Sequence, residues 1–166
     1  MKRIWAPWRV PYITQIIKKE KGCIFCKLGK SKKDKNNLIF IRTEHCFAVL
    51  NLYPYNNGHT LVVPNRHVKD LSKLRSDETT DLFALLNYTK SLLDAVMHPD
   101  GYNIGMNIGR AAGAGVPGHI HIHIVPRWSG DANFMPVVSN TKVISQSLKA
   151  LHTMLCREHK RKNAKR

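Results

Sequence analysis

Short apolar segments separated by turn residues occupy most of the chain, and one longer segment among them has the period of a helix. The short segments are rich in β-branched and aromatic residues and are bounded by Gly, Pro, Asn or Asp, a pattern typical of β-strands. They comprise residues 38–41, 46–50, 60–63 and 102–108, and a fifth segment that starts at His119. Turn-rich connections of hairpin length join them, so the pattern predicts an antiparallel sheet of about five strands.

The longer segment begins near Ser76, where leucines start to recur at the spacing of one helix face. Ser76 is expected to cap this helix, with Asp77 and Glu78 in the first turn. The helix should end before His98, because Pro99 and a turn dipeptide follow. One long helix combined with antiparallel strands predicts an α+β fold.

Length and composition fit one ordinary globular domain. The chain has 166 residues, of which 43% are hydrophobic and 23% are charged. No apolar run reaches the length of a membrane span, and the first residues lack the apolar stretch of a secretory signal. We therefore expect a cytoplasmic protein without a membrane partner. The simplest division is a domain over residues 1–155, including an N-terminal extension, followed by a basic C-terminal tail over residues 156–166.

Positive charge is the unusual feature of the composition. The formal net charge is +16, and it is concentrated in residues 18–35, with eight Lys, and in residues 156–166, with six basic residues. Two interpretations stay open: a solvated loop and a frayed tail, or a surface that attracts polyanions such as nucleic acid. Basicity alone does not decide between them, and a nucleic-acid partner is not the favoured interpretation.

Three histidines alternate with isoleucines at the fifth apolar segment. On a strand, His119, His121 and His123 share one face while the isoleucines lie on the other. His119 and His123 would be about 13 Å apart at about 3.3 Å per residue, too far for one zinc ion with ligand bonds of about 2.1 Å. We therefore prefer a catalytic strand in which the middle imidazole is a nucleophile. An exposed polar face is the alternative.

A glycine-rich loop directly precedes these histidines. Glycines such as Gly113 and Gly115 allow close approach of the backbone to a ligand, and successive amides there can bind an anion. Arg110 and Arg127 could add charge complementary to phosphate oxygens. A flexible connector with solvent-exposed arginines is the alternative.

The four cysteines divide into a pair and two single residues. Cys23 and Cys26 form a CxxC, which in a cytosolic chain is more often metal-binding or redox-active than a structural disulfide. We expect Cys46 to be a buried thiol and Cys156 a surface thiol.

Several motifs in order give a specific resemblance. The His119–His123 pattern followed by IleValProArg resembles the histidine triad family of nucleotide hydrolases and transferases, in particular its diadenosine tetraphosphate hydrolase and phosphorylase branch. The likeness extends to residues 5–9, 23–26, 51–59, 62–67, 103–115 and 127–136. It implies a histidine-triad fold with a long helix and a C-terminal helix, paired into a homodimer.

The resemblance also implies roles for individual residues. His121 would attack the α-phosphorus of a nucleotide and form a covalent nucleotidyl-histidine, with a backbone carbonyl fixing its tautomer. His123 would contact the leaving oxygen, and His59 would help to build the catalytic core. The substrate contacts implied by motif or by charge are Asn51 at the ribose, Asn107, Gly113, Gly115 and Arg127 near the phosphates, and Ile24, Phe25, Phe47 and Leu50 around the base.

A structural zinc is a further implication. In some family members a CxxC, a histidine after a ValXxxPro element and the first histidine of the triad hold this ion, and the matching residues are Cys23, Cys26, His67 and His119. His119 would then be a ligand and not a catalyst. One departure concerns residues 113–118, which read GlyAlaGlyValProGly where many members place a GlnSer or GlnThr pair.

The sequence therefore predicts an enzyme that cleaves dinucleoside polyphosphates at the α-phosphate, by hydrolysis or phosphorolysis. Two alternatives stay open. The first is a nucleoside phosphoramidase. The second is a non-catalytic, zinc-containing module that binds nucleotides or RNA through its basic tail.

Overall fold

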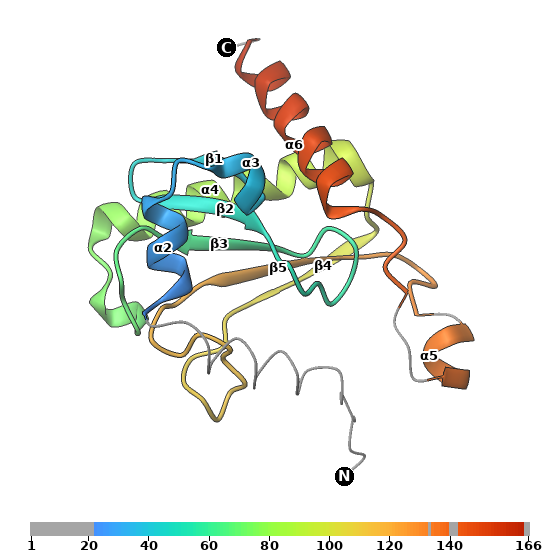
Figure 1. Ribbon diagram of the computed structural model, residues 1–166, viewed down its shortest axis with the longest axis horizontal. Coiled ribbons are helices and arrows are strands. Elements are labelled where there is room, and N and C mark those ends of the chain that lie inside the picture. The colour runs from blue at the N-terminus through green and yellow to red at the C-terminus, as the bar shows by residue number, and fades with distance from the viewer. Residues whose placement is uncertain (1–21, 133, 140–142, 165–166) are drawn as a thin grey trace.

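An antiparallel sheet with helices on both faces forms the body of the protein (Figure 1). The computed structural model describes residues 22–132, 134–139 and 143–164. The strands are β1 (Ile39–Arg42), β2 (Cys46–Leu50), β3 (Thr60–Pro64), β4 (Gly101–Gly105) and β5 (Ile122–Arg127), in the sheet order β1-β2-β3-β5-β4. Every neighbouring pair is antiparallel, which confirms the predicted α+β class and the five-stranded sheet.

Helix α4 (Ser76–Met97) closely matches the long helix predicted from the leucine spacing. The predicted cap is wrong by one residue: Ser76 is the first helical residue and Arg75 precedes it as the N-cap. The reason is that Glu78 accepts a hydrogen bond from the Arg75 backbone N–H at 2.9 Å, so a carboxylate satisfies the donor at the helix start. Among the described helices, α4 included, none is long and apolar enough to cross a membrane.

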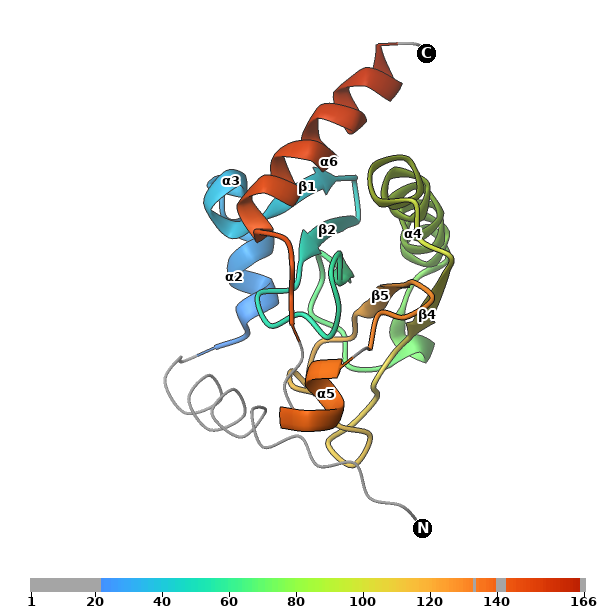
Figure 2. The same cartoon turned by 90° about the vertical axis from the view of Figure 1, so that its right-hand side faces the viewer.

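Helices cover the two faces of the sheet unequally (Figure 2). On one face, α4 and the C-terminal helix α6 (Leu148–Asn163) bury leucines against β-strand side chains such as Ile122 and Ile124. On the other face lies the short helix α2 (Ile24–Lys30), whose Phe25 packs in a second apolar cluster. The remaining helices are the short α3 (Asp34–Asn37), η1 (Leu71–Lys73) and α5 (Phe134–Ser139).

Where the structure describes them, the basic segments are largely helical and not a loop and a frayed tail. Where residues 18–35 are described, they contain α2 and begin α3, and residues 156–163 form the last turns of α6. The predicted division after residue 155 thus falls inside one continuous helix and stays a prediction. The resemblance at residues 5–9 lies outside the described residues.

The single cysteines differ in exposure. Cys46 is fully buried, as predicted. Cys156 is half-buried and not a surface thiol, because it packs against the main apolar cluster.

Candidate active site and metal centre

The alternation of histidine and isoleucine holds, but the strand starts later than predicted. Strand β5 begins at Ile122, so His119 and His121 precede the ladder. By the register that pairs Val62 with Ile122, Pro64 would face residue 120, and a proline has no N–H for the ladder. The Ile120 N–H donates instead to the Val68 carbonyl at 2.8 Å.

A cavity of about 300 Å³ lies over the sheet face opposite α4 and contains the two later histidines. Its walls come from α2, the connection between β2 and β3, and the glycine-rich loop. The lining residues are Phe25, Asn51, Leu52, Tyr53, Pro54, Tyr55, Leu61, Asn107, Gly113, Gly115, His121 and His123. A cavity of this size, with convergent imidazoles and amides, is a candidate active site.

His121 has a defined tautomer. It is 5% exposed, and its Nδ1 lies 2.9 Å from the His119 carbonyl oxygen. A carbonyl only accepts, so Nδ1–H donates and Nε2 keeps its lone pair. Burial lowers the pKa of His121, and the hydrogen bond to the carbonyl opposes this only in part. The ring is therefore held neutral, with a lone pair on Nε2.

His59 and His123 are joined by a hydrogen bond whose direction the backbone fixes. The Tyr55 N–H donates to His59 Nδ1 at 3.0 Å, so this nitrogen is an acceptor and His59 Nε2 carries the proton. His59 Nε2–H then donates to His123 Nδ1 at 2.9 Å. His123 accordingly carries its proton on Nε2 and is a donor there, whereas Nε2 of His121 carries a lone pair.

Asn51 supports the same arrangement. Its Nδ2 lies 3.2 Å from His59 Nδ1, and its Oδ1 accepts the Tyr53 N–H at 3.0 Å. The Tyr55 ring also covers His59, with ring centroids 4.5 Å apart. The connection between β2 and β3 thus fixes His59, which is fully buried.

Four residues that are distant in sequence form a group that could hold a metal ion. Cys23 and Cys26 come from the start of α2, His67 follows β3, and His119 precedes β5. Their ligand atoms all lie within 4.8 Å of one another. The Pro64 carbonyl accepts from His119 Nε2 at 2.9 Å, which leaves His119 Nδ1 as the atom with a lone pair toward the group.

The dimensions of this group fit a tetrahedral site. The Sγ atom of Cys23 lies 3.3 Å from His119 Nδ1, and that of Cys26 lies 3.3 Å from His67 Nδ1 and 3.6 Å from His119 Nδ1. A tetrahedral zinc ion with bonds of about 2.3 Å to sulfur and 2.05 Å to nitrogen separates such ligands by about 3.6 Å. Burial lowers the pKa of His119 to about 4, so the ring is neutral, as a ligand must be.

Some predicted site residues do not line the cavity. The Arg127 guanidinium is bound by Asp131 at 2.6 Å and by Asn103 at 2.7 Å, and Arg127 is not among the lining residues. Of the four residues expected around a base, Phe25 lines the cavity and contacts His121 at a ring-centroid distance of 4.7 Å. Phe47 and Leu50 are instead core side chains, Ile24 packs against the second apolar cluster, and none of these three lines the cavity.

Tyr53 and Tyr55 are site residues that the sequence reasoning missed. Both line the cavity, and the two residues are 47% and 39% exposed. The Pro, Asn and Gly residues around them predict a turn and indicate no ligand contact. Two tyrosines within such a connection were the available signal, because loops that carry large aromatic side chains often bind ligands.

Comparison with known proteins agrees with this geometry. The HIT domain family model matches residues 32–130. The chain is 36% identical over 165 residues to "AP-4-A phosphorylase" of Mycobacterium tuberculosis. The aligned residues cover 95% of this chain and 84% of that protein. It is 39% identical over 101 residues to the asymmetrical bis(5'-nucleosyl)-tetraphosphatase of Schizosaccharomyces pombe, covering 61% and 55% of the two chains.

A solved structure gives the same result. A Zn-bound histidine triad family protein from Mycobacterium smegmatis superposes with a TM-score of 0.69 and 25% identity, covering 87% of this chain and 98% of that one. The family match spans more than half of the chain. The chain belongs to the HIT domain, or histidine triad, family.

Proposed function

We propose that the protein cleaves dinucleoside polyphosphates at the α-phosphate through a covalent nucleotide on His121. The observation that carries this proposal is the hydrogen bond from His121 Nδ1 to the His119 carbonyl, which leaves the Nε2 lone pair for attack. The enzyme names of the relatives, a phosphorylase and a tetraphosphatase that act on such substrates, support the same reaction class.

The first step forms a bond between His121 Nε2 and the α-phosphorus while the bond from phosphorus to the leaving oxygen breaks. His123 Nε2–H donates to that oxygen, because the His59 bond to His123 Nδ1 fixes the proton on the other nitrogen. The positive charge that develops on the His121 ring is stabilised by the His119 carbonyl. The phosphate leaving group of the first step departs as an anion, so His123 donates a hydrogen bond and keeps its proton. In the second step an acceptor attacks phosphorus while the bond from phosphorus to His121 Nε2 breaks, which restores the neutral His121 ring.

We propose inorganic phosphate as this acceptor, so that the reaction is a phosphorolysis. The similarity to the protein named AP-4-A phosphorylase extends over 95% of this chain, whereas the similarity to the named tetraphosphatase covers 61%. The glycine-rich loop agrees with a second anion, because Gly113 and Gly115 line the cavity without side chains that would fill it.

The other lining residues would hold the substrate. Asn51 and Asn107 would bind polar groups of the nucleotide, the Gly113 and Gly115 backbone would approach the phosphates, and Phe25 would contact the base. Arg127 is left out of this set, because Asp131 and Asn103 occupy its guanidinium.

We propose zinc for the Cys23, Cys26, His67 and His119 group. The fit of the distances and the two thiol and two imidazole donors support this metal. When bound, zinc would act as a structural cross-link between α2 and the segments flanking β3 and β5. It would also hold Phe25 against His121, because Phe25 lies between Cys23 and Cys26 in the sequence.

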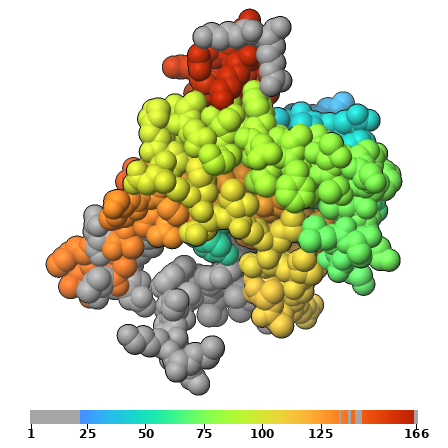
Figure 3. Space-filling view, turned by 180° about the vertical axis from the view of Figure 1, so that it is seen from behind, coloured from blue at the N-terminus to red at the C-terminus, as the bar shows by residue number. Residues whose placement is uncertain are grey.

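We further propose a homodimer formed through the edge strand β4. This strand pairs only with β5 within the described sheet, and Ile104 on it is 46% exposed. Phe83 of α4 is 49% exposed, and Figure 3 shows α4 and β4 together on this face. A free edge with exposed apolar side chains favours pairing with a second copy. Light scattering tests this, and Ile104→Lys is expected to give a monomer.

The compartment is also part of the proposal. None of the four cysteines forms a disulfide, which agrees with a reducing compartment, and we propose the cytoplasm.

Product analysis tests the function. Incubation with diadenosine tetraphosphate is expected to give ADP and ATP only when inorganic phosphate is present; AMP and ATP without phosphate would instead indicate hydrolysis. Mass spectrometry of protein denatured at alkaline pH, where a phosphorus–histidine bond is stable, is expected to find a nucleotide on His121. His121→Asn should abolish both results, while the control His98→Asn should retain them, because asparagine tolerates the left-handed backbone of residue 98 (φ 47°).

Three outcomes would contradict the proposal. Turnover retained by His121→Asn would exclude the covalent mechanism. Faster cleavage of an adenosine phosphoramidate than of the dinucleotide would identify a phosphoramidase. Absence of cleavage of any nucleotide would leave the non-catalytic binding module.

A further inference from the structure

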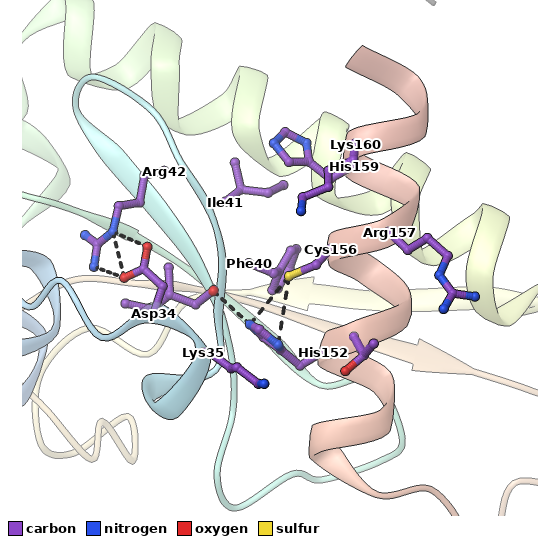
Figure 4. A pocket seen from close by; sticks show the side chains of 12 residues that line it. Asp34, Lys35, Phe40, Ile41, Arg42, His152, Cys156, Arg157, His159 and Lys160 are labelled. Carbon is purple, nitrogen blue, oxygen red and sulfur yellow. Dashed lines mark hydrogen bonds and ion pairs between the residues drawn. The ribbon is translucent and has the colours of Figure 1, made fainter. Parts of the chain in front are cut away.

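A basic groove lies at the opposite end of the sheet from the cavity. It has a volume of about 700 Å³ and runs between α3, β1 and α6 (Figure 4). Its lining residues are Asp34, Lys35, Ile39, Phe40, Ile41, Arg42, His152, Thr153, Cys156, Arg157, His159 and Lys160. None of them lines the candidate active site, and β2 and β3 separate β1 from β5 in the sheet.

Three cations of the groove have no ionic partner among the described residues. Lys35, Arg157 and Lys160 are exposed, and they make no ion pair or side-chain hydrogen bond within the part of the chain that the structure describes. Neighbouring cations outside the groove are engaged. The Arg161 guanidinium binds Glu158 at 2.6 Å, and Lys162 Nζ binds the Ser91 carbonyl at 3.0 Å.

The acidic residue of the groove does not cancel this charge. The Asp34 carboxylate is bound by Arg42, with nitrogen–oxygen distances of 2.7 to 3.1 Å. This pair is neutral as a unit, and the same Arg42 also donates to the carbonyls of Leu28 and Gly29. Lys35, Arg157 and Lys160 therefore give the groove a net charge of +3, with its two walls contributing from different helices.

The helix dipole accounts for only part of this arrangement. Basic residues in the last turn of a helix stabilise it, and Lys160 in α6 and Lys35 in the four-residue helix α3 both lie in such a turn. Arg157 precedes the last turn of α6 and has no such explanation. The feature that all three cations have in common is the groove that they line.

The floor of the groove is formed by the edge strand β1 together with apolar and aromatic side chains. His152 Nε2–H donates to the Ile39 carbonyl at 2.9 Å, so part of the free edge of β1 is already satisfied and is less available for another strand. Phe40, Ile41 and His152 lie beside it and are 5–6% exposed, whereas the His159 imidazole is only half-buried and lines the same space (Figure 4). A partly exposed ring among cations suits a ligand that alternates phosphates with planar bases.

We propose that this groove binds single-stranded nucleic acid, with Lys35, Arg157 and Lys160 contacting phosphates. A concave groove with cations on both walls admits a single strand more readily than the convex surface of a duplex. The apolar floor distinguishes this ligand from inorganic polyphosphate, which has no bases to lie there. The site goes beyond the proposed nucleotide cleavage and does not depend on it.

Fluorescence anisotropy with a labelled oligouridylate of about 12 nucleotides tests the proposal. Three phosphate contacts predict a slope of about −2 for the logarithm of affinity against the logarithm of salt concentration, which is about a 20-fold loss between 50 and 200 mM salt. The variant Lys35→Gln/Arg157→Gln/Lys160→Gln should weaken binding at low salt by on the order of tenfold and remove about 2 from the slope.

A matched variant separates the groove from general charge. Lys69→Gln/Lys73→Gln/Lys149→Gln removes the same charge from exposed lysines outside the groove, and it should leave affinity within about twofold. Both variants are expected to retain wild-type nucleotide cleavage, because none of the six residues lines the cavity.

Four results would overturn the proposal. The first is absence of oligouridylate binding at 50 mM salt. The second is an equal loss of affinity in the groove variant and the matched variant. The third is binding of polyphosphate with the same number of phosphates as tightly as the oligonucleotide, and the fourth is equally tight binding of polyglutamate.

Discussion

Replacement of Gly58 by alanine tests how tightly the fold positions His59. Gly58 has a φ of +75° and directly precedes His59. A Cβ atom on this residue would lie 2.6 Å from Met97 Sδ and 3.0 Å from Pro126 Cγ, at the end of α4 and on β5. Alanine therefore meets two separate costs, one from the backbone conformation and one from packing.

The magnitude follows from these two contributions. A non-glycine residue in the left-handed region costs about 1–2 kcal/mol. Overpacking costs about 1–3 kcal/mol, and the lower end applies because the unbranched Met97 side chain can rotate away. We expect Gly58→Ala to lower the free energy of unfolding by about 2–3 kcal/mol.

Two other glycines separate the contributions in the same assay, urea unfolding followed by far-ultraviolet circular dichroism. Gly109 has a φ of +81° with no atom within 4 Å of an added Cβ, so Gly109→Ala should cost only the backbone term of about 1–2 kcal/mol. Gly101 has neither a left-handed φ nor a close neighbour, so Gly101→Ala should be neutral or stabilising by up to about 1 kcal/mol.

The reasoning is refuted if Gly58→Ala costs no more than Gly109→Ala, because the contact with Met97 and Pro126 would then be irrelevant. It also fails if cleavage by Gly58→Ala at a temperature where the variant is folded matches the wild type. We expect cleavage to fall, because a displaced His59 no longer donates to His123.

Three further predictions concern the site and its support. His59→Ala should lower kcat about 100-fold with KM within about threefold, because His59 positions the hydrogen-bond donor to the leaving oxygen and so affects the reaction more than binding. A change confined to KM in steady-state kinetics would make His59 a substrate ligand. Cys26→Ser should lose bound zinc by elemental analysis and about 2.7 kcal/mol of stability at zinc concentrations near 100 times the Kd, whereas Cys156→Ser should retain both. The hydrogen bond from Arg66 holds the pKa of Glu78 at about 2, below its ordinary 4.5, so the stability it contributes is complete above pH 4.5 and is lost as pH falls toward 2. We expect the free energy of unfolding, measured in urea, to fall by about 1–2 kcal/mol at acid pH. This is less than the about 3 kcal/mol that the full pKa shift would give, because the Arg66 side chain is 42% exposed and solvent screens the ion pair. Glu78→Gln should remove this acid dependence, and if the variant kept it, other groups would be its cause.

The sequence by itself determined which residues belong to the main elements and which faces they bury. The leucine spacing and Pro99 were enough for α4, and the period of two placed Ile122 and Ile124 in the core opposite His123. Such patterns are readable because each periodicity depends only on local backbone geometry and on the tendency of apolar side chains to leave water. The histidine tautomer proposed from family resemblance for His121 also agrees with the observed carbonyl contact.

Only the tertiary structure decided which polar group meets which. Strand β5 starts late because the Ile120 N–H donates to Val68 and not to the sheet. The tautomer of His123 follows from the Tyr55 N–H that donates to His59. Arg127 does not line the cavity because Asp131 binds its guanidinium. The basic groove exists because α6 packs beside β1, more than 100 residues away in the sequence. Hydrogen bonds and ion pairs act over a few ångströms in directions fixed by neighbouring elements, so their partners follow from the assembled chain and not from local sequence patterns.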